Sequence, residues 1–262
     1  MVQLDLAADH AGASIRLPAH DTGVAVVRQF VAGMAQVLHL DDHACEDLKL
    51  ATTEACTNAV VHAYPNGSTG SMAVTLEPGE DDDLVVIVRD EGRGLPAEHA
   101  AGEGDGYGIS LIQAVSHDLQ LGAHNGGGLE LRMRFRHARQ TPDEPLDAVH
   151  SPVLRRVIAL IAAHAGFSMD RLSDAVLVAE TLAAHAPSHT AGAVVRVRVE
   201  DRDGHVILRV GPLGEGGAKG LLDASRLPAY GPLLEHLADA VECELGGDRD
   251  GEHLVVTLAP RG

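Results

Sequence analysis

The order of predicted secondary structure occurs twice along the 262-residue chain, and this repetition limits its fold more than any other feature. A polar stretch with two prolines, residues 137–150, separates the two halves. Each half predicts two helices, two strands, a glycine-rich loop, a helix and two more strands. In the first half the predicted elements cover residues 22–38, 42–63, 72–78, 84–90, 108–116, 118–124 and 129–135. In the second half they cover residues 152–164, 170–186, 193–200, 205–210, 227–240, 241–247 and 253–259.

Short motifs recur at matching places in the two halves and indicate a duplicated unit. Glu180 stands where Glu54 stands in the first half, and the strand sequence VIVRD returns as VILRV. We therefore expect an α+β fold, a two-layer sandwich of a mixed β-sheet with helices on one face, present in tandem. The first domain would cover residues 1–138, a linker 139–150 and the second domain 151–262. Two unrelated modules with the same order by coincidence remain the alternative.

The charge and the scarcity of aromatic residues argue against direct binding of nucleic acid. The formal net charge is -18, and the chain has no Trp, three Tyr and three Phe. Nucleic-acid binding needs clustered Lys and Arg for the phosphates, and single strands need aromatic platforms for the bases. An acidic surface instead suits a basic protein partner.

Three further features predict a cytoplasmic protein without a membrane segment. Cys45, Cys56 and Cys243 are odd in number and lack CxxC spacing, as is usual in a reducing cytosol. The first ten residues lack the basic start and apolar run of a signal peptide. The longest apolar stretch, residues 157–167, is far shorter than the roughly 20 residues that span a bilayer.

The second predicted helix carries an unusual polar stripe. Its sequence LATTEACTNAVVHAYP places Glu54, Asn58 and His62 four residues apart, so that they return to nearly the same helix face. A core-facing helix would have apolar residues there, and buried polar groups without partners are costly. We therefore expect the stripe to face a wet cleft, with an ordinary solvated face as the alternative.

The strand that follows ends in an acidic, glycine-containing sequence. Hydrophobic VVIV runs directly into Asp90, and Gly92 and Gly94 come next. A carboxylate can accept hydrogen bonds from the amino edge of a base, and glycines let a backbone approach a flat ring. Taken alone, this DxGxG sequence also fits a plain hairpin turn.

A glycine-rich loop precedes the third predicted helix. The sequence GEGDGYGISLIQ contains Gly106 and Gly108 just ahead of the apolar run. Free N–H groups at a helix N-terminus bind phosphate oxygens. A mobile loop without a ligand would have the same sequence.

The three signals in this order resemble a known superfamily. ExxxNxxxH, DxGxG and GxG look like the N, G1 and G2 boxes of the GHKL, or Bergerat-fold, ATPases, which include HATPase_c-like domains. Within that superfamily, EACTNAVVHAYP closely resembles the anti-sigma factor serine/threonine kinases of bacteria. The resemblance covers about residues 14–135, and the second half resembles it only as a scaffold.

The resemblance implies roles for the site residues, with ATP and Mg²⁺ as cofactors. Asn58 would bind the magnesium ion, and Glu54 would act as the general base for the hydroxyl that attacks the γ-phosphate. Asp90 would bind the adenine amino group, with Gly92 and Gly94 beside the ring.

Other positions would complete the nucleotide site. Gly106 and Gly108 would act as hinges of the ATP lid. His62 would support the residues that contact the nucleotide. The lid from residue 95 to 108 contains three acidic residues and no Lys or Arg. Neutralisation of the triphosphate must therefore depend on Mg²⁺, backbone amides and Arg93. The sequence also has Gly128-Leu129 where the family commonly has Gly-Thr.

The second half lacks the residues that the nucleotide would need. Ala184 stands at the position of Asn58, and Val210 at the position of Asp90. We expect a degenerate copy that binds no ATP and serves packing or partner contact.

The family resemblance implies an anti-sigma regulatory serine/threonine protein kinase, a transferase in transcription regulation. Such kinases form homodimers, sequester a sigma factor and phosphorylate a serine of a STAS-domain anti-anti-sigma protein. Here the fused second module would take the place of a second subunit in a monomeric pseudo-dimer, with a homodimer as the alternative.

Two other functions compete with this one. In the first, a non-catalytic regulator uses ATP only to gate its affinity for a protein partner. The second, a sensor histidine kinase fragment, is disfavoured because only about 50 residues precede Glu54, too few for a helix pair with a phosphoacceptor His.

Overall fold

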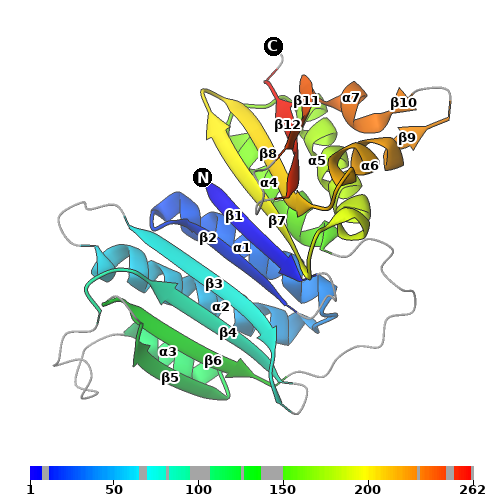
Figure 1. The fold of residues 1–262 in the computed structure, drawn as a ribbon. Coiled ribbons are helices and arrows are strands. Elements are labelled where there is room, and N and C mark those ends of the chain that lie inside the picture. Colours follow the sequence, from blue (N-terminus) through cyan, green and yellow to red (C-terminus); the bar gives the residue numbers. More distant parts are fainter. Residues whose placement is uncertain are drawn as a thin grey trace. The chain divides into compact units, whose positions relative to one another are not determined.

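The computed structural model describes residues 1–7, 12–64, 70–80, 83–94, 107–124, 127–136, 150–228, 231–245 and 251–260. They form two compact units (Figure 1). The first unit is Gly12–Asp143, and the second unit combines Met1–Ala11 with Glu144–Gly262. In the described ranges no helix is both long and apolar enough to cross a membrane.

The first unit is a two-layer α+β sandwich. Its sheet has the strand order β2-β3-β4-β6-β5. Figure 1 shows the helices α1, α2 and α3 on one face of this sheet. In chain order the elements are β2 (Ala13–Pro18), α1 (Asp21–Val37), α2 (Asp42–Asn58), the π-helix η1 (Ala59–Ala63), β3 (Ser71–Pro78), β4 (Leu84–Asp90), α3 (Tyr107–Val115), β5 (Asp118–Ala123) and β6 (Leu129–Phe135).

The sandwich with helices on one face confirms the expected fold class, but the described strand pairs are all antiparallel rather than mixed. The connections explain this difference. Two consecutive helices join β2 to β3, so the chain reverses direction three times, before α1, between α1 and α2, and after α2. After three reversals β3 runs opposite to β2, whereas a single crossover helix reverses the chain twice and makes the neighbours parallel.

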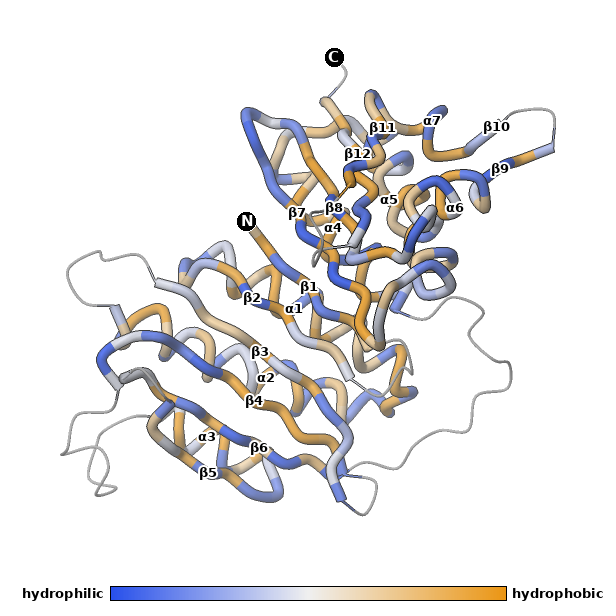
Figure 2. Tube along the Cα trace, viewed as in Figure 1, coloured by the Kyte–Doolittle hydropathy of each residue, from blue (hydrophilic) through white to orange (hydrophobic). Residues whose placement is uncertain are grey.

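A capping side chain marks the start of α2, and apolar side chains form the buried faces of α1 and α2. The Asp41 side chain accepts a hydrogen bond from the Ala44 N–H at 2.8 Å and so caps α2. Phe30 and Met34 of α1 and Leu48 of α2 are fully buried. The central strand β4 is hydrophobic along most of its length, as Figure 2 shows, and ends in the buried Asp90. The core thus fixes the strand end that carries the predicted acid.

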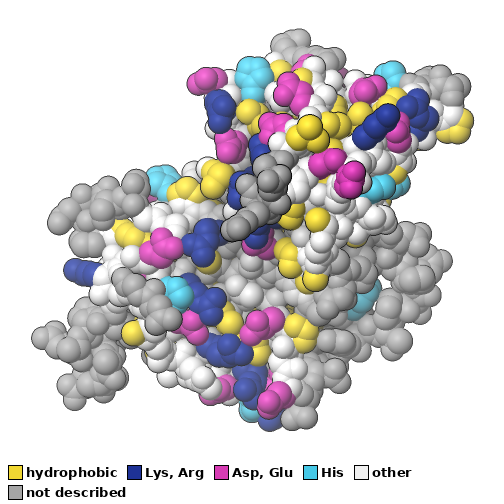
Figure 3. Space-filling model, in the orientation of Figure 1, with side chains coloured by type: hydrophobic (Ala, Val, Ile, Leu, Met, Phe, Trp, Pro, Cys, Tyr) yellow, Lys and Arg dark blue, Asp and Glu magenta, His cyan; other side chains and the backbone are white. Residues whose placement is uncertain are grey.

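The face of this sheet opposite the helices is polar. Figure 3 shows basic and acidic side chains intermixed over it. Arg89 pairs with Glu130 at 2.6 Å, and Arg132 pairs with Glu77 at 3.2 Å. Cross-strand ion pairs of this kind keep the open face neutral and solvated.

The second unit repeats the same arrangement. Its sheet order is β1-β7-β8-β12-β11, again with antiparallel pairs. Two helices precede the hairpin β7-β8, as α1 and α2 precede β3-β4. The elements are β1 (Val2–Ala7), α4 (Ser151–His164), α5 (Met169–His185), the 3₁₀-helix η4 (Ala186–His189), β7 (Val194–Arg202), β8 (His205–Leu213), α6 (Gly217–Ala224), β9 (Arg226–Leu227), β10 (Gly231–Pro232), α7 (Leu233–Leu237), β11 (Ala240–Leu245) and β12 (Glu252–Leu258).

The first strand of the chain belongs to the second unit, although the sequence analysis grouped it with residues 1–138. Strand β1 pairs with β7 over its whole length, from Val2 opposite Val199 to Ala7 opposite Val194. Leu4 is fully buried in this unit. In the second sheet β1 therefore takes the place that β2 takes in the first.

The segment after β8 also differs from the prediction. A glycine-rich loop was expected there, but residues Gly217–Ala224 form the helix α6. The long helix expected over residues 227–240 is reduced to the single turn of α7 between short strands. Both changes lie at the position that corresponds to the lid and α3 of the first unit.

Candidate functional site

A pocket of about 840 Å³, its solvent-open mouth included, lies in the first unit where α2 passes into η1. Five of the predicted site residues line it: Asn58, His62, Asp90, Arg93 and Gly94. Its apolar wall is formed by side chains that the sequence analysis did not select, Val88, Ile109, Leu129 and Leu131. Their hydrophobic character fits a flat, largely apolar ligand part such as a base.

Asp90 is the buried acid of this pocket, with 3% of its surface exposed. Its Oδ1 atom accepts hydrogen bonds from the N–H groups of Gly92 at 2.8 Å and Leu129 at 3.3 Å. Two donors on one oxygen fix the orientation of the carboxylate. Among the described contacts none engages Oδ2, which leaves that oxygen for a donor on a ligand. The contact with Leu129 uses its backbone, so the replacement of the family's Thr leaves it intact.

The glycines beside Asp90 are required, but for a reason other than the one expected. A Cβ on Gly92 would lie 2.4 Å from the carbonyl oxygen of Ala63. Gly94 has a φ of +71°, and its Cβ would lie 2.8 Å from the carbonyl oxygen of Gly127. Both glycines therefore allow close contact between backbone segments of the protein, which closes the wall around the pocket.

Glu54 and Asn58 meet the start of α3. A Cβ built on Gly108 would lie 3.1 Å from Nδ2 of Asn58 and 3.3 Å from Oε2 of Glu54. The N–H groups of the first turn of a helix have no partner within the helix itself. An acid, an amide and a helix N-terminus thus converge at one end of the site. Gly106, predicted as a lid hinge, lies outside the described residues.

His62 does not continue the polar stripe in the regular way expected. After Asn58 the helix changes to the π-form over Ala59–Ala63, and each of its hydrogen bonds spans one more residue than in an α-helix. His62 lines the pocket and is exposed, and its carbonyl oxygen accepts a hydrogen bond from Nε of Arg93 at 3.2 Å. This contact places the Arg93 guanidinium at the pocket rim.

The corresponding place in the second unit has different side chains. Ala184 and the fully buried Val210 replace the amide and the acid. Glu180, which corresponds to Glu54, forms an ion pair with Arg155 at 3.6 Å. The side chains of Ala184 and Val210 have no polar atom that could bind a metal or the amino group of a base.

Helix α6 packs against η4, α5 and β12, the elements that correspond to the pocket walls of the first unit. Its Ala218 and Leu221 are buried, and a Cβ on Gly220 would lie 2.8 Å from the ring of His189. The Glu252 carboxylate accepts hydrogen bonds from the N–H groups of Gly216 at 2.7 Å and Ala218 at 3.0 Å. These hydrogen bonds lower the pKa of Glu252. The helix N-terminus therefore already holds an anion supplied by the protein.

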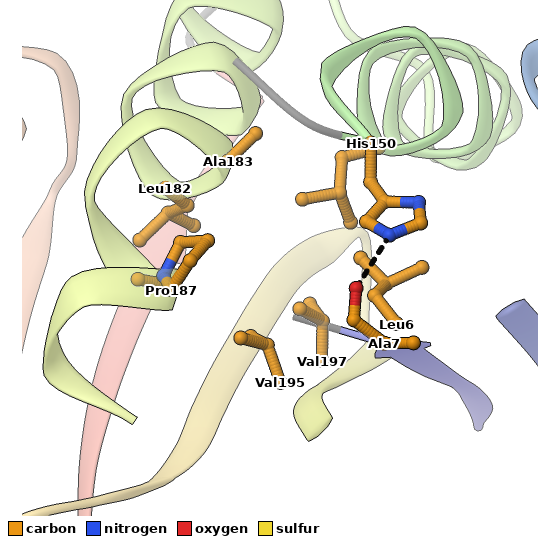
Figure 4. A pocket seen from close by; sticks show the side chains of 10 residues that line it. Leu6, Ala7, His150, Leu182, Ala183, Pro187, Val195 and Val197 are labelled. Carbon is orange, nitrogen blue, oxygen red and sulfur yellow. Dashed lines mark hydrogen bonds between the residues drawn. The ribbon is translucent and has the colours of Figure 1, made fainter. Parts of the chain in front are cut away.

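A different, small apolar pocket, with room for about 10 Å³, lies in the second unit between β1, β7 and the helices α4 and α5 (Figure 4). Leu6, Leu182, Val195 and Val197 line it, and His150 bonds the Ala7 carbonyl through Nε2 at 2.9 Å. No carboxylate or amide side chain is among its lining residues. It does not correspond to the pocket of the first unit, which is lined by Asn58 and Asp90.

Residues 17–135 match the family model of the histidine kinase-like ATPase domain. Fold, buried acid and helix N-terminus thus define the first unit as an ATPase domain of this class. The serine-protein kinase RsbW of Bacillus subtilis is 30% identical over 127 residues, which are 43% of this chain and 78% of that protein. RsbW of Bacillus licheniformis is 40% identical over 127 residues with the same coverage. The chain belongs to the RsbW family of serine-protein kinases.

Among solved structures, the RsbU and RsbW domains of a Mycobacterium tuberculosis protein align with 98% of this chain and 88% of that one, at 12% identity and a TM-score of 0.30. The histidine kinase domain of a blue-light activated kinase from Erythrobacter litoralis covers 36% of this chain and 47% of that one, at 22% identity and a TM-score of 0.32.

Proposed function

We propose that the first unit binds Mg-ATP and transfers its γ-phosphoryl group to a protein serine. The observation that carries this proposal is the approach of Gly108 to both Asn58 and Glu54. A helix N-terminus, an amide and a carboxylate lie close together there, which supports a site for phosphates and a metal ion. The buried Asp90 belongs to the same pocket and would hold the base.

The donor set fits a magnesium nucleotide. Mg²⁺ prefers oxygen ligands and is bound through one or two protein groups together with phosphates and water. Asn58 would supply its amide oxygen to the ion, and the N–H groups at the start of α3 would bind phosphate oxygens. ATP would supply the phosphoryl group, and Mg²⁺ would neutralise part of the triphosphate charge.

Each side chain then has a definite task. Oδ2 of Asp90 accepts the adenine amino group, while its other oxygen stays fixed by Gly92 and Leu129. The Glu54 carboxylate takes the proton of the attacking serine hydroxyl. Arg93, held by the His62 carbonyl, supplies positive charge at the rim.

The proposal extends to the partners that the family resemblance implies. The protein would sequester a sigma factor in the cytoplasm and phosphorylate a STAS-domain anti-anti-sigma protein on serine, as a regulator of transcription. The net charge of -18 suits a partner with a basic surface. The relatives matched here carry the name serine-protein kinase, which agrees with a hydroxyl acceptor.

We further propose that the second unit is a degenerate copy that binds no nucleotide. The shared strand order supports duplication, and Ala184, Val210 and the position of α6 argue against a second ATP site. The fused copy would take the place of a second subunit and make the chain a pseudo-dimer. The proposal of a monomeric pseudo-dimer would be contradicted if light scattering showed a dimer at all protein concentrations.

The test of the kinase uses Glu54→Gln, with Glu46→Gln as a control because Glu46 is an exposed residue of the same helix. Each protein is incubated with Mg-ATP and candidate STAS-domain proteins. We expect phosphoserine with wild type and Glu46→Gln, a loss of at least about 100-fold with Glu54→Gln, and equal ATP affinity in all three. ATP binding without transfer in wild type would favour the ATP-gated, non-catalytic regulator. Failure to bind ATP would overturn both.

A further inference from the structure

The hydroxyl of Tyr64 joins two backbone segments beside the pocket. It donates to the Ser71 carbonyl oxygen at 2.5 Å and accepts from the Glu91 N–H at 2.8 Å. Ser71 begins β3, and Glu91 follows Asp90 at the end of β4. One side-chain oxygen thus fixes the backbone immediately after the acid that faces the pocket.

The ring of Tyr64 is held as firmly as its hydroxyl. A Cβ on Gly70 would lie 1.8 Å from the ring, so glycine is required there for the ring to pack on the backbone. Burial raises the pKa of Tyr64. The hydroxyl therefore stays protonated and keeps its role as a donor at neutral pH.

Tyr64 directly follows the π-helix η1. In addition, the Arg93 N–H donates to the Ala63 carbonyl at 3.2 Å, and Gly92 packs on Ala63. The end of the helix that carries Glu54 and Asn58 is therefore tied directly to the loop after Asp90. These contacts set the separation between the two ends of the nucleotide site.

We infer that Tyr64 is a positioning residue for the adenine base, acting through the backbone at Glu91 to hold Asp90 in place. The inference rests on the proposed ATP site. Asp90 recognises an amino group, which adenine carries at the position where guanine has a carbonyl. A displaced Asp90 therefore weakens the binding of ATP. The binding of GTP stays unchanged, because GTP gains nothing from the Asp90 carboxylate.

The neighbouring side-chain contacts provide a control. Arg16 donates to the Glu91 carboxylate at 2.8 Å, but both side chains are more than half exposed. Exposed ion pairs contribute little. Arg16→Ala removes this contact and leaves both hydrogen bonds of Tyr64 in place.

The test compares wild type, Tyr64→Phe, Gly70→Ala and Arg16→Ala in the full chain. Tyr64→Phe removes one hydroxyl, and Gly70→Ala displaces the ring while the hydroxyl is kept. For both we expect KM for ATP to rise about three- to tenfold, kcat to stay unchanged and the preference for ATP over GTP to fall by the same factor. Arg16→Ala should stay within about twofold of wild type.

Thermal unfolding of each variant separates positioning from stability. The inference is overturned if a variant that folds has a lower midpoint of thermal unfolding but an unchanged KM and an unchanged preference for ATP. That result would show that the role of Tyr64 is purely structural. If wild type binds no nucleotide, the proposed function itself fails. If wild type binds ATP and Tyr64→Phe binds it equally well, only the inference fails.

Discussion

Gly108 at the start of α3 lies against the side chain of Asn58, and a Cβ on this glycine would come within 3.1 Å of the amide nitrogen. Space at this point is therefore limited by the residue proposed to hold the metal. Glu54 bounds the same space at 3.3 Å. A side chain at Gly108 would take the volume that phosphate oxygens and the ion need.

Gly108→Val should weaken Mg-ATP binding at least about tenfold, because the new methyl groups displace Asn58 and Glu54. Gly122→Val is the matched control, since a Cβ on Gly122 in β5 meets nothing within 4 Å. Titration with a fluorescent ATP analogue measures the affinity, and circular dichroism checks the fold. Equal affinities in the two variants would show that the start of α3 is not part of the phosphate site.

The chain should bind one nucleotide, and Asp90→Asn should remove it. The amide keeps the shape of the buried carboxylate but presents no charged acceptor to the base. Val210→Ala, at the corresponding position of the second unit, should leave both stoichiometry and affinity unchanged. Equilibrium dialysis with labelled ATP gives both quantities. A second nucleotide site would contradict the role given to α6, and a site that survives Asp90→Asn would contradict the role given to Asp90.

Loss of the β1 contacts should destabilise the second unit. Leu4 is fully buried there, so Leu4→Ala should cost about 2–5 kcal/mol. Met1→Ala is the control, because Met1 is 64% exposed. Hydrogen exchange should be faster in β7 and β8 with Leu4→Ala, while ATP affinity stays the same. Faster exchange in β3 and β4 alone would place the strand in the first unit.

Cys56 should resist alkylation in the folded protein, whereas the exposed Cys243 should react. Burial raises the pKa of the Cys56 thiol to about 12 from an ordinary 9.0. The folded state therefore favours the protonated thiol, which contributes stability below about pH 9, and this contribution is lost as pH rises from 9 to about 12.

Mass spectrometry after iodoacetamide treatment at pH 8 measures the labelling of each cysteine. Cys56→Ser should flatten the loss of stability above pH 9. Rapid native-state labelling of Cys56 would show that the α2 core opens more often than its burial indicates.

Local patterns were sufficient to predict most of the first unit. The strand over residues 84–90 was predicted from sequence because a hydrophobic run acts over a few residues. The placement of Asp90 at a buried strand end follows from the same local signal. The hydrogen bond that Asp90 accepts from the Leu129 N–H does not follow from a local signal, because this donor lies on a strand 39 residues later.

Features set by distant partners were missed. Strand β1 was not predicted because its partner β7 lies about 190 residues away, as the contact of Asp5 with Arg196 shows. Helix α6 looked like a loop because of its glycines, and its cap is the side chain of Glu252 from β12. The π-turn at Ala59–Ala63 moved His62 out of the regular four-residue spacing. In each case tertiary contacts overrode the local preference.

The pairing of β1 with β7 also has a consequence during synthesis on the ribosome. All residues of the first unit are synthesised before α5 and β7. At about 5–20 residues per second, the segment Val2–Ala7 waits roughly 10–40 s for its partner strand. During that interval the apolar side chains of Leu4 and Leu6, which are buried in the folded protein, lack the strand that pairs with β1, and they are open to chaperones or to another nascent chain.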